Sequence, residues 1–277
     1  MLNILMENPF LLRALISVVL TSFSAATMGT FIVLRGISFL TAEVAHAALA
    51  GVALAIFLQS VGILPSWNPF IIAIIFALGT ATLTGYASER GQIHTMEAAI
   101  GVAFAISMAL AVTLMGLVPS ERLPEIWGYL IGDVLLLTYN DIIMLTITTI
   151  IITVITTLFL KEFLYISFDI EGAEAMGINT NRYNYLMLIV AALAIVIETK
   201  TVGSILVYTY MILPAAIISK MNKNITQIMS YSLILSILTG VAGIWFSLIT
   251  DLPPSGIIGI ILSTTYMIIN IFKKKEQ

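Results

Sequence analysis

The sequence predicts an all-α membrane protein, a polytopic bundle of about nine spanning helices. Hydrophobic residues make up 60% of the 277 residues and charged residues only 10%, a composition outside the usual range of soluble domains. The mean hydropathy is +1.07. Long apolar runs recur along the whole chain, and no polar stretch is long enough for a separate domain. We therefore expect residues 1–277 to form a single transmembrane domain in the cell membrane, surrounded by lipid.

Each predicted span is an apolar run close to the ~20 residues that a helix needs to cross about 30 Å of hydrocarbon. The first run is too long for the core of a signal peptide and has no basic segment before it, so we expect it to remain as a helix. A further apolar stretch, 123–137, is shorter and carries Asp133, which predicts a re-entrant or half-helix. The candidate spans lie near residues 10–34, 38–58, 70–87, 92–118, 141–160, 183–199, 202–219, 225–250 and 256–272.

The distribution of basic residues predicts the orientation. Lys and Arg are enriched in cytoplasmic loops, and the chain has 12 of them. If the lysines at 273–275 are cytoplasmic, nine spans leave only Arg13, Arg122 and Lys200 outside. The other basic residues then lie inside, namely Arg35, Arg90, Lys161, Arg182, Lys220 and Lys223. Counting 123–137 as a full span would break this pattern, which supports its interpretation as a half-helix.

Two Glu/His pairs lie inside otherwise apolar runs. The chain has 2 histidines, and each has a glutamate three positions away, in the pairs Glu43/His46 and His94/Glu97. An ionisable group in a membrane segment costs about 2.5–3.5 kcal/mol even on lenient scales, and positions i and i+3 share a helix face. The second and fourth spans run in the same direction with the pairs at similar depth. The pattern predicts a divalent transition-metal site; the alternative is two local hydrogen-bonded pairs near helix ends.

The types of residue present narrow the chemistry of such a site. Imidazole and carboxylate ligands together suit Zn, Mn or Fe, and the lack of cysteine excludes thiolate ligands and disulfides. The sequence contains neither a GxxxxGK[ST] phosphate-binding loop nor an HExxH motif of zinc proteases. We therefore expect no ATP hydrolysis by this chain, no resident cofactor and no nucleic-acid partner.

The longest polar connection, 161–182, contains a predicted short helix at 169–176. Acidic residues near its start and Gly177 as a stop favour this helix. A helix of that size cannot form a core alone, so we interpret it as a docking element for another protein, with a solvated loop as the alternative. Glu198, beside Lys200 at an outer helix end, is interpreted as a snorkelling residue.

Several segments resemble a known family when taken in order. They are MGTFIVLRGISFLTAEVAHAALAGVALA, EAAIGVAF, YLIGD, EGAEAMGIN, TVGSILVYTYMILPAA and DLPPSG, and they are similar to the zinc/manganese permeases of ATP-binding-cassette importers. The resemblance implies a permease subunit that is not itself an enzyme and that carries Zn²⁺ or Mn²⁺ as cargo. It also implies a homodimer, two cytoplasmic ATPase subunits and an extracytoplasmic metal-binding protein as partners. The helix at 169–176 would then be the coupling helix, with Asp169, Glu171, Glu174, Ala175 and Gly177 at the ATPase.

The family pattern carries over to the metal site with one departure. Family members commonly place an aspartate four residues before the histidine, where this chain has Ala42, and Glu43 follows one position later. Glu97 stands where the family has an acid before its AIG stretch. The role of His94 rests on spacing alone.

Two other functions remain open on the residues. One is a stand-alone metal carrier driven by an ion gradient, which would need no ATPase. The other is a membrane-embedded metalloenzyme with a glutamate as general base. The carrier predicts metal flux with this chain alone, whereas the enzyme needs an open metal position and a substrate cleft.

Overall fold

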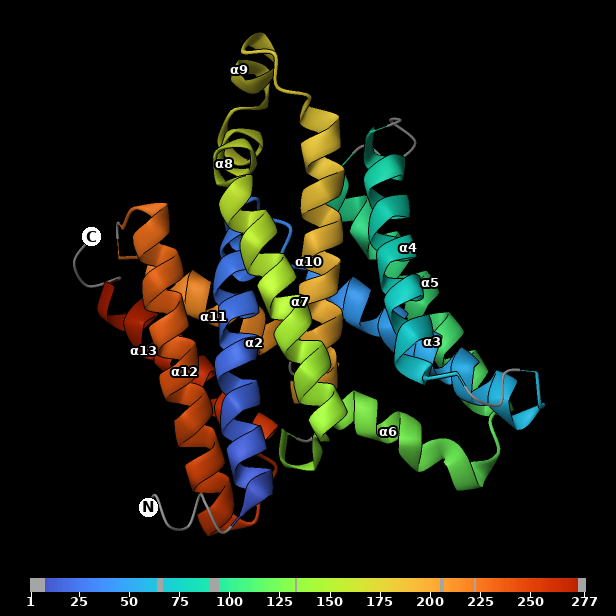
Figure 1. The fold of residues 1–277 in the computed structure, drawn as a ribbon. Coiled ribbons are helices and arrows are strands. Elements are labelled where there is room, and N and C mark those ends of the chain that lie inside the picture. The colour runs from blue at the N-terminus through green and yellow to red at the C-terminus, as the bar shows by residue number, and fades with distance from the viewer. Residues whose placement is uncertain are drawn as a thin grey trace.

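The computed structural model describes residues 8–63, 67–89, 95–132, 134–204, 207–221 and 223–273. Over these residues the regular structure is entirely helical (Figure 1), as predicted. Eight of the described helices are long and apolar enough to span a membrane. They are α2 (Pro9–Leu34), α3 (Leu40–Ser60), α4 (Pro69–Glu89), α5 (Met96–Leu117), α7 (Tyr139–Leu158), α10 (Thr180–Val202), α12 (Ile225–Thr250) and α13 (Pro254–Lys273).

The seventh of the nine expected spans, 202–219, differs from the prediction. Helix α10 continues to Val202, Gly203 ends it with a left-handed φ of 87°, and α11 (Val207–Ser219) has only 13 residues. Such a helix covers about 20 Å, too little to cross a bilayer alone. The apolar run that the sequence presents as a full span therefore forms one short helix, which starts after a break in the helical backbone.

The half-helix predicted at 123–137 is confirmed, and it meets the break between α10 and α11. Helix α6 (Leu123–Ile131) is followed by a 3₁₀ turn, η2 (Val134–Leu136), while Asp133 lies outside the described residues. The backbone N–H of Ser204 donates a hydrogen bond to the Tyr129 carbonyl at 3.1 Å. This bond satisfies backbone groups that neither helix can pair internally.

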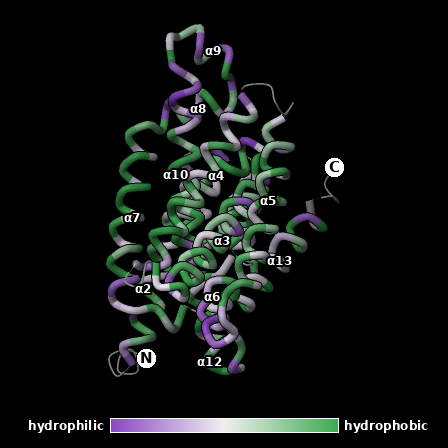
Figure 2. The backbone as a smooth tube through the Cα atoms, turned by 90° about the vertical axis from the view of Figure 1, so that its right-hand side faces the viewer, coloured by the Kyte–Doolittle hydropathy of each residue, from purple (hydrophilic) through white to green (hydrophobic). Residues whose placement is uncertain are grey.

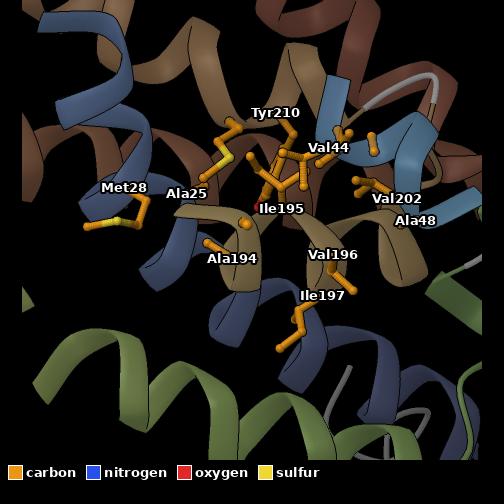
Figure 3. Packing of buried hydrophobic residues seen from close by; sticks show 14 of the residues in the cluster. Ala25, Met28, Val44, Ala48, Ala194, Ile195, Val196, Ile197, Val202 and Tyr210 are labelled. Atoms are coloured by element: carbon orange, nitrogen blue, oxygen red, sulfur yellow. The ribbon is translucent and has the colours of Figure 1, made fainter. Parts of the chain in front are cut away.

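Helices α2, α3 and α10 form the centre of the bundle. In their most apolar stretches 67%, 78% and 72% of the residues are buried, against 22% in α5 and in α7. Small side chains allow this close packing, and Figure 3 shows Ala25, Ala48 and Ala194 at the meeting of the three helices. The peripheral helices instead expose many large apolar side chains. Figure 2 shows that hydrophobic residues make up most of the bundle.

The two ends of the molecule differ in structure. Helices α8 (Leu160–Phe168) and α9 (Ile170–Ala175) project from one end, and α6 lies at the opposite end (Figure 1). Helix α9 is the short helix predicted within the polar connection. Helix α8 was not predicted, and it forms because Phe163 and Ile166 bury one of its faces. The loop carrying α9 lies on the side that the basic residues predict to be cytoplasmic.

Candidate metal site

Glu43 lies fully buried between α3 and α4. Its Oε1 accepts a hydrogen bond of 2.7 Å from the Thr84 hydroxyl on α4. Its Oε2 has no hydrogen-bond partner within the described residues. The carboxyl group is therefore directed into the bundle, away from solvent, and one of its oxygens is available for a ligand or a proton.

His46 lies on the same helix but faces α5. Its ring packs edge-on against Phe104, with 5.1 Å between the ring centroids, and its side chain is only partly buried. Its Nδ1 is 2.8 Å from the Ala42 carbonyl oxygen. A carbonyl can only accept, so Nδ1 donates this bond, and in the neutral ring Nε2 then keeps its lone pair. A histidine that binds a metal typically makes this kind of backbone bond with its other nitrogen.

The second predicted pair is only partly visible. Glu97 is exposed in the first turn of α5, one position after Met96, where a carboxylate favours the helix N-terminus. His94 lies outside the described residues. Among the described residues no three His, Cys, Asp or Glu side chains come close enough to hold a metal ion. The four-ligand site of Glu43, His46, His94 and Glu97 therefore stays a prediction.

Glu198 is a buried acid that the sequence reading missed. It is 0% exposed, and its Oε1 accepts a hydrogen bond of 3.0 Å from the Ser24 hydroxyl on α2. The snorkelling interpretation is wrong for Glu198 because α10 continues past it into the protein. Lys200 points elsewhere and forms an ion pair with Asp141 at the start of α7. The sequence holds no local signal for this pairing, because α2 carries several hydroxyl side chains besides Ser24, namely Ser17, Thr21, Ser22, Thr27 and Thr30.

Helix α9 is held by local hydrogen bonds and exposes several of its side chains. Asp169 caps the helix by accepting from the Gly172 N–H at 2.8 Å, and Gly177 ends the turn after the helix with a φ of 80°. Glu174 accepts a hydrogen bond of 2.8 Å from the Thr180 hydroxyl at the start of α10. The exposed residues of α9 are Ile170, Glu171, Glu174 and Ala175, and Met176, directly after the helix, is exposed too. A projecting helix with two large apolar side chains half exposed can pack against another protein.

Replacing Thr84 by valine is expected to destabilise the protein by about 1–3 kcal/mol, because it removes the hydroxyl that satisfies a buried Glu43 oxygen. Valine has nearly the same shape, so packing changes little. The midpoint of thermal unfolding in detergent measures the effect. Thr84→Ser keeps the donor and is the control. Equal midpoints for the valine and serine variants would contradict the role assigned to this bond.

Comparisons with known proteins agree over nearly the whole chain. The sequence profile described as the ABC 3 transport family matches residues 7–273. The manganese transport system membrane protein MntC of Listeria monocytogenes serovar 1/2a is 30% identical over 272 residues, which cover 98% of this chain and 94% of that protein. The high-affinity zinc uptake system membrane protein ZnuB of Haemophilus influenzae is 27% identical over 266 residues, covering 96% of this chain and 98% of that protein.

A solved structure shares the fold. The structure described as PsaBC from Streptococcus pneumoniae in complex with Fab contains a chain that superimposes with a TM-score of 0.82 at 27% sequence identity. The match covers 97% of this chain and 93% of that one. The shared fold therefore extends over nearly the full length of both chains.

Proposed function

This chain belongs to the ABC 3 transport family, and we propose that it forms the membrane path by which Mn²⁺ or Zn²⁺ is imported. It is a multi-pass permease subunit of the cell membrane and a transport subunit rather than an enzyme. The metal is cargo, and we expect no resident cofactor. Relatives named for manganese and for zinc are similar to this chain to nearly the same degree, so the proposal includes both metals.

The hydrogen bond and the partial exposure of the His46 side chain are the observation that carries the proposal. An imidazole whose Nδ1 is bonded to the Ala42 carbonyl offers Nε2 to a metal, and its side chain is partly open rather than enclosed. Zinc and manganese both accept imidazole and carboxylate ligands. Glu43, one turn earlier on α3, supplies an unpartnered buried oxygen nearby along the same helix.

A second copy of the chain would complete the coordination. The described part of one chain does not bring three ligands together, whereas two copies related by a two-fold axis would supply two His46 side chains. The exposed apolar face of α5, beside His46, is a candidate surface for that contact. We therefore propose a homodimer with the path for the metal between the copies.

The energy source is proposed to be a separate cytoplasmic ATPase that binds α9. This helix projects from the bundle and exposes Ile170 and Met176, which are 50% and 56% accessible, beside the acidic Glu171. An extracytoplasmic metal-binding protein is proposed to deliver the metal at the opposite end, where α6 lies. These partners follow from family membership together with the surface of α9.

Reconstitution in liposomes tests this function. We expect uptake of radioactive manganese or zinc when the chain is reconstituted with its ATPase and binding protein and supplied with ATP. Competition between the two metals then identifies the preferred cargo. Uptake by this chain alone without ATP would contradict the proposal and favour a carrier driven by an ion gradient.

A further inference from the structure

Helix α10 connects α9 to the helices that carry Glu43 and His46. It starts at Thr180, five residues after α9 ends, and the Thr180 hydroxyl donates a hydrogen bond of 2.8 Å to Glu174 of α9. The side chain four residues later, Asn184, lies on the same face of α10. The first two turns of α10 therefore carry two contact residues on one face: Thr180 bonds to α9, and Asn184 bonds to the bundle.

Asn184 is bonded on both sides of its amide. Its Oδ1 accepts a hydrogen bond of 2.7 Å from Nη1 of Arg35, in the turn between α2 and α3. Its Nδ2 donates a hydrogen bond of 3.2 Å to Oε1 of Glu89, the last residue of α4. One amide thus joins the start of α10 to the cytoplasmic ends of three other helices.

The Arg35 bond lies in a partly desolvated position. Burial lowers the pKa of Arg35 below its usual value, so the guanidinium has lost part of its hydration. The same Nη1 lies 3.9 Å from the sulfur of Met187, one turn further along α10. A charged donor that has lost water depends on its remaining acceptors. The link between Arg35 and Asn184 is therefore expected to persist when the helix moves.

The helices held by Asn184 are those of the site. Arg35 caps the end of α2, and the short turn that follows it leads into α3, which carries Glu43 and His46. Glu89 ends α4, which carries Thr84. The bond from Thr84 to Glu43 joins α3 and α4 again at the depth of the site. A displacement at the start of α10 therefore acts on both helices through the same side chain.

The far end of α10 is fixed as well. Lys200 forms an ion pair with Asp141 at the start of α7, and its Nζ lies 4.8 Å from the centre of the Phe70 ring on α4. Most of the length of α10 is packed against α2, α3, α4 and α7, so a displacement of this helix has to be accommodated by those neighbours. Motion of α9 then reaches the site as a displacement of α10.

From these contacts we propose that Asn184 is a positioning residue that transmits the displacement of α9 to α3 and α4. This inference rests on the proposed function, in which an ATPase acts on α9 and a metal binds at α3. Asn184 touches neither the ATPase nor the metal in this scheme. Its role is to couple ATP hydrolysis to metal movement.

The test is the number of metal ions imported per ATP hydrolysed by the reconstituted complex of permease, ATPase and binding protein. Asn184→Ala is expected to lower this ratio by at least about fivefold, the lower end of typical couplings between distant sites. Misfolding of a fraction of the protein removes import and hydrolysis together, so it leaves the ratio unchanged. Asn184→Asp keeps an acceptor for Arg35 but loses the donor to Glu89, and its ratio is expected between those of alanine and wild type.

Asn181→Ala is the matched control, because Asn181 is an exposed asparagine in the first turn of α10, three positions before Asn184. Its ratio is expected to equal that of the wild type. A wild-type ratio in Asn184→Ala, with ATP-dependent import intact in the wild-type complex, would overturn the inference alone. Failure of the wild-type complex to import either metal with ATP would instead overturn the proposed function, and the inference with it.

Discussion

Replacing His46 by alanine is expected to abolish ATP-dependent metal import and to weaken metal binding by more than about 100-fold. Loss of a residue that only supports a metal ligand already costs about 10–100-fold in affinity, and His46 is proposed to be a ligand itself. The affinity of the purified permease for Mn²⁺ and Zn²⁺, measured by calorimetry, tests this directly. Because the side chain is only partly buried, its removal leaves little empty volume in the core.

His94→Ala is the informative comparison, since it changes the other histidine of the chain. If His94 is a ligand, its loss lowers affinity to a similar degree, whereas a histidine outside the site leaves affinity unchanged. Glu43→Gln and Glu97→Gln extend the series to the two acids. Unaltered affinity and import in His46→Ala, with normal thermal unfolding, would contradict the proposed site.

The positions of the spans were predictable because a membrane requires about 20 apolar residues in succession. Seven of the nine predicted runs correspond closely to full-length helices of the structure. The exceptions are 202–219 and 92–118, whose start is only partly described. The prediction of a span at 202–219 was wrong because the sequence stays apolar through Gly203, whereas the helical backbone is interrupted there. A glycine that ends a helix inside an apolar run is invisible to a hydropathy average.

For the candidate site, the sequence predicted only the relative placement of Glu43 and His46 along one helix. A spacing of three places Glu43 and His46 on one face of α3, but the contacts with other helices decide where each side chain points. Glu43 turns towards Thr84 of α4, 41 positions later in the chain, and His46 turns towards Phe104 of α5. Such pairings arise from packing between distant segments, for which the local pattern of one sequence holds no signal. Glu198 was misread for the same reason, because its partner Ser24 lies on α2.

Gly203→Ala is expected to lower the free energy of unfolding by about 2–6 kcal/mol, the sum of backbone strain and overpacking. Gly203 has a φ of 87° and a ψ of 154°, a conformation that side chains other than glycine rarely adopt. An added Cβ would also lie only 2.6 Å from the backbone nitrogen of Gly132, at the end of α6. The break between α10 and α11 would have to open, and the bond from Ser204 to Tyr129 would be strained with it.

Gly79→Ala separates this local effect from a general cost of replacing glycine. A Cβ at Gly79, inside α4, would meet nothing within 4 Å. Alanine there is expected to be neutral or to stabilise by up to about 1 kcal/mol, because glycine is the poorer helix former. Thermal unfolding in detergent, together with the yield of monodisperse protein, compares the two variants. Similar midpoints for Gly203→Ala and Gly79→Ala would mean that the contact between α6 and the α10–α11 break can relax, and that glycine is not required to hold it.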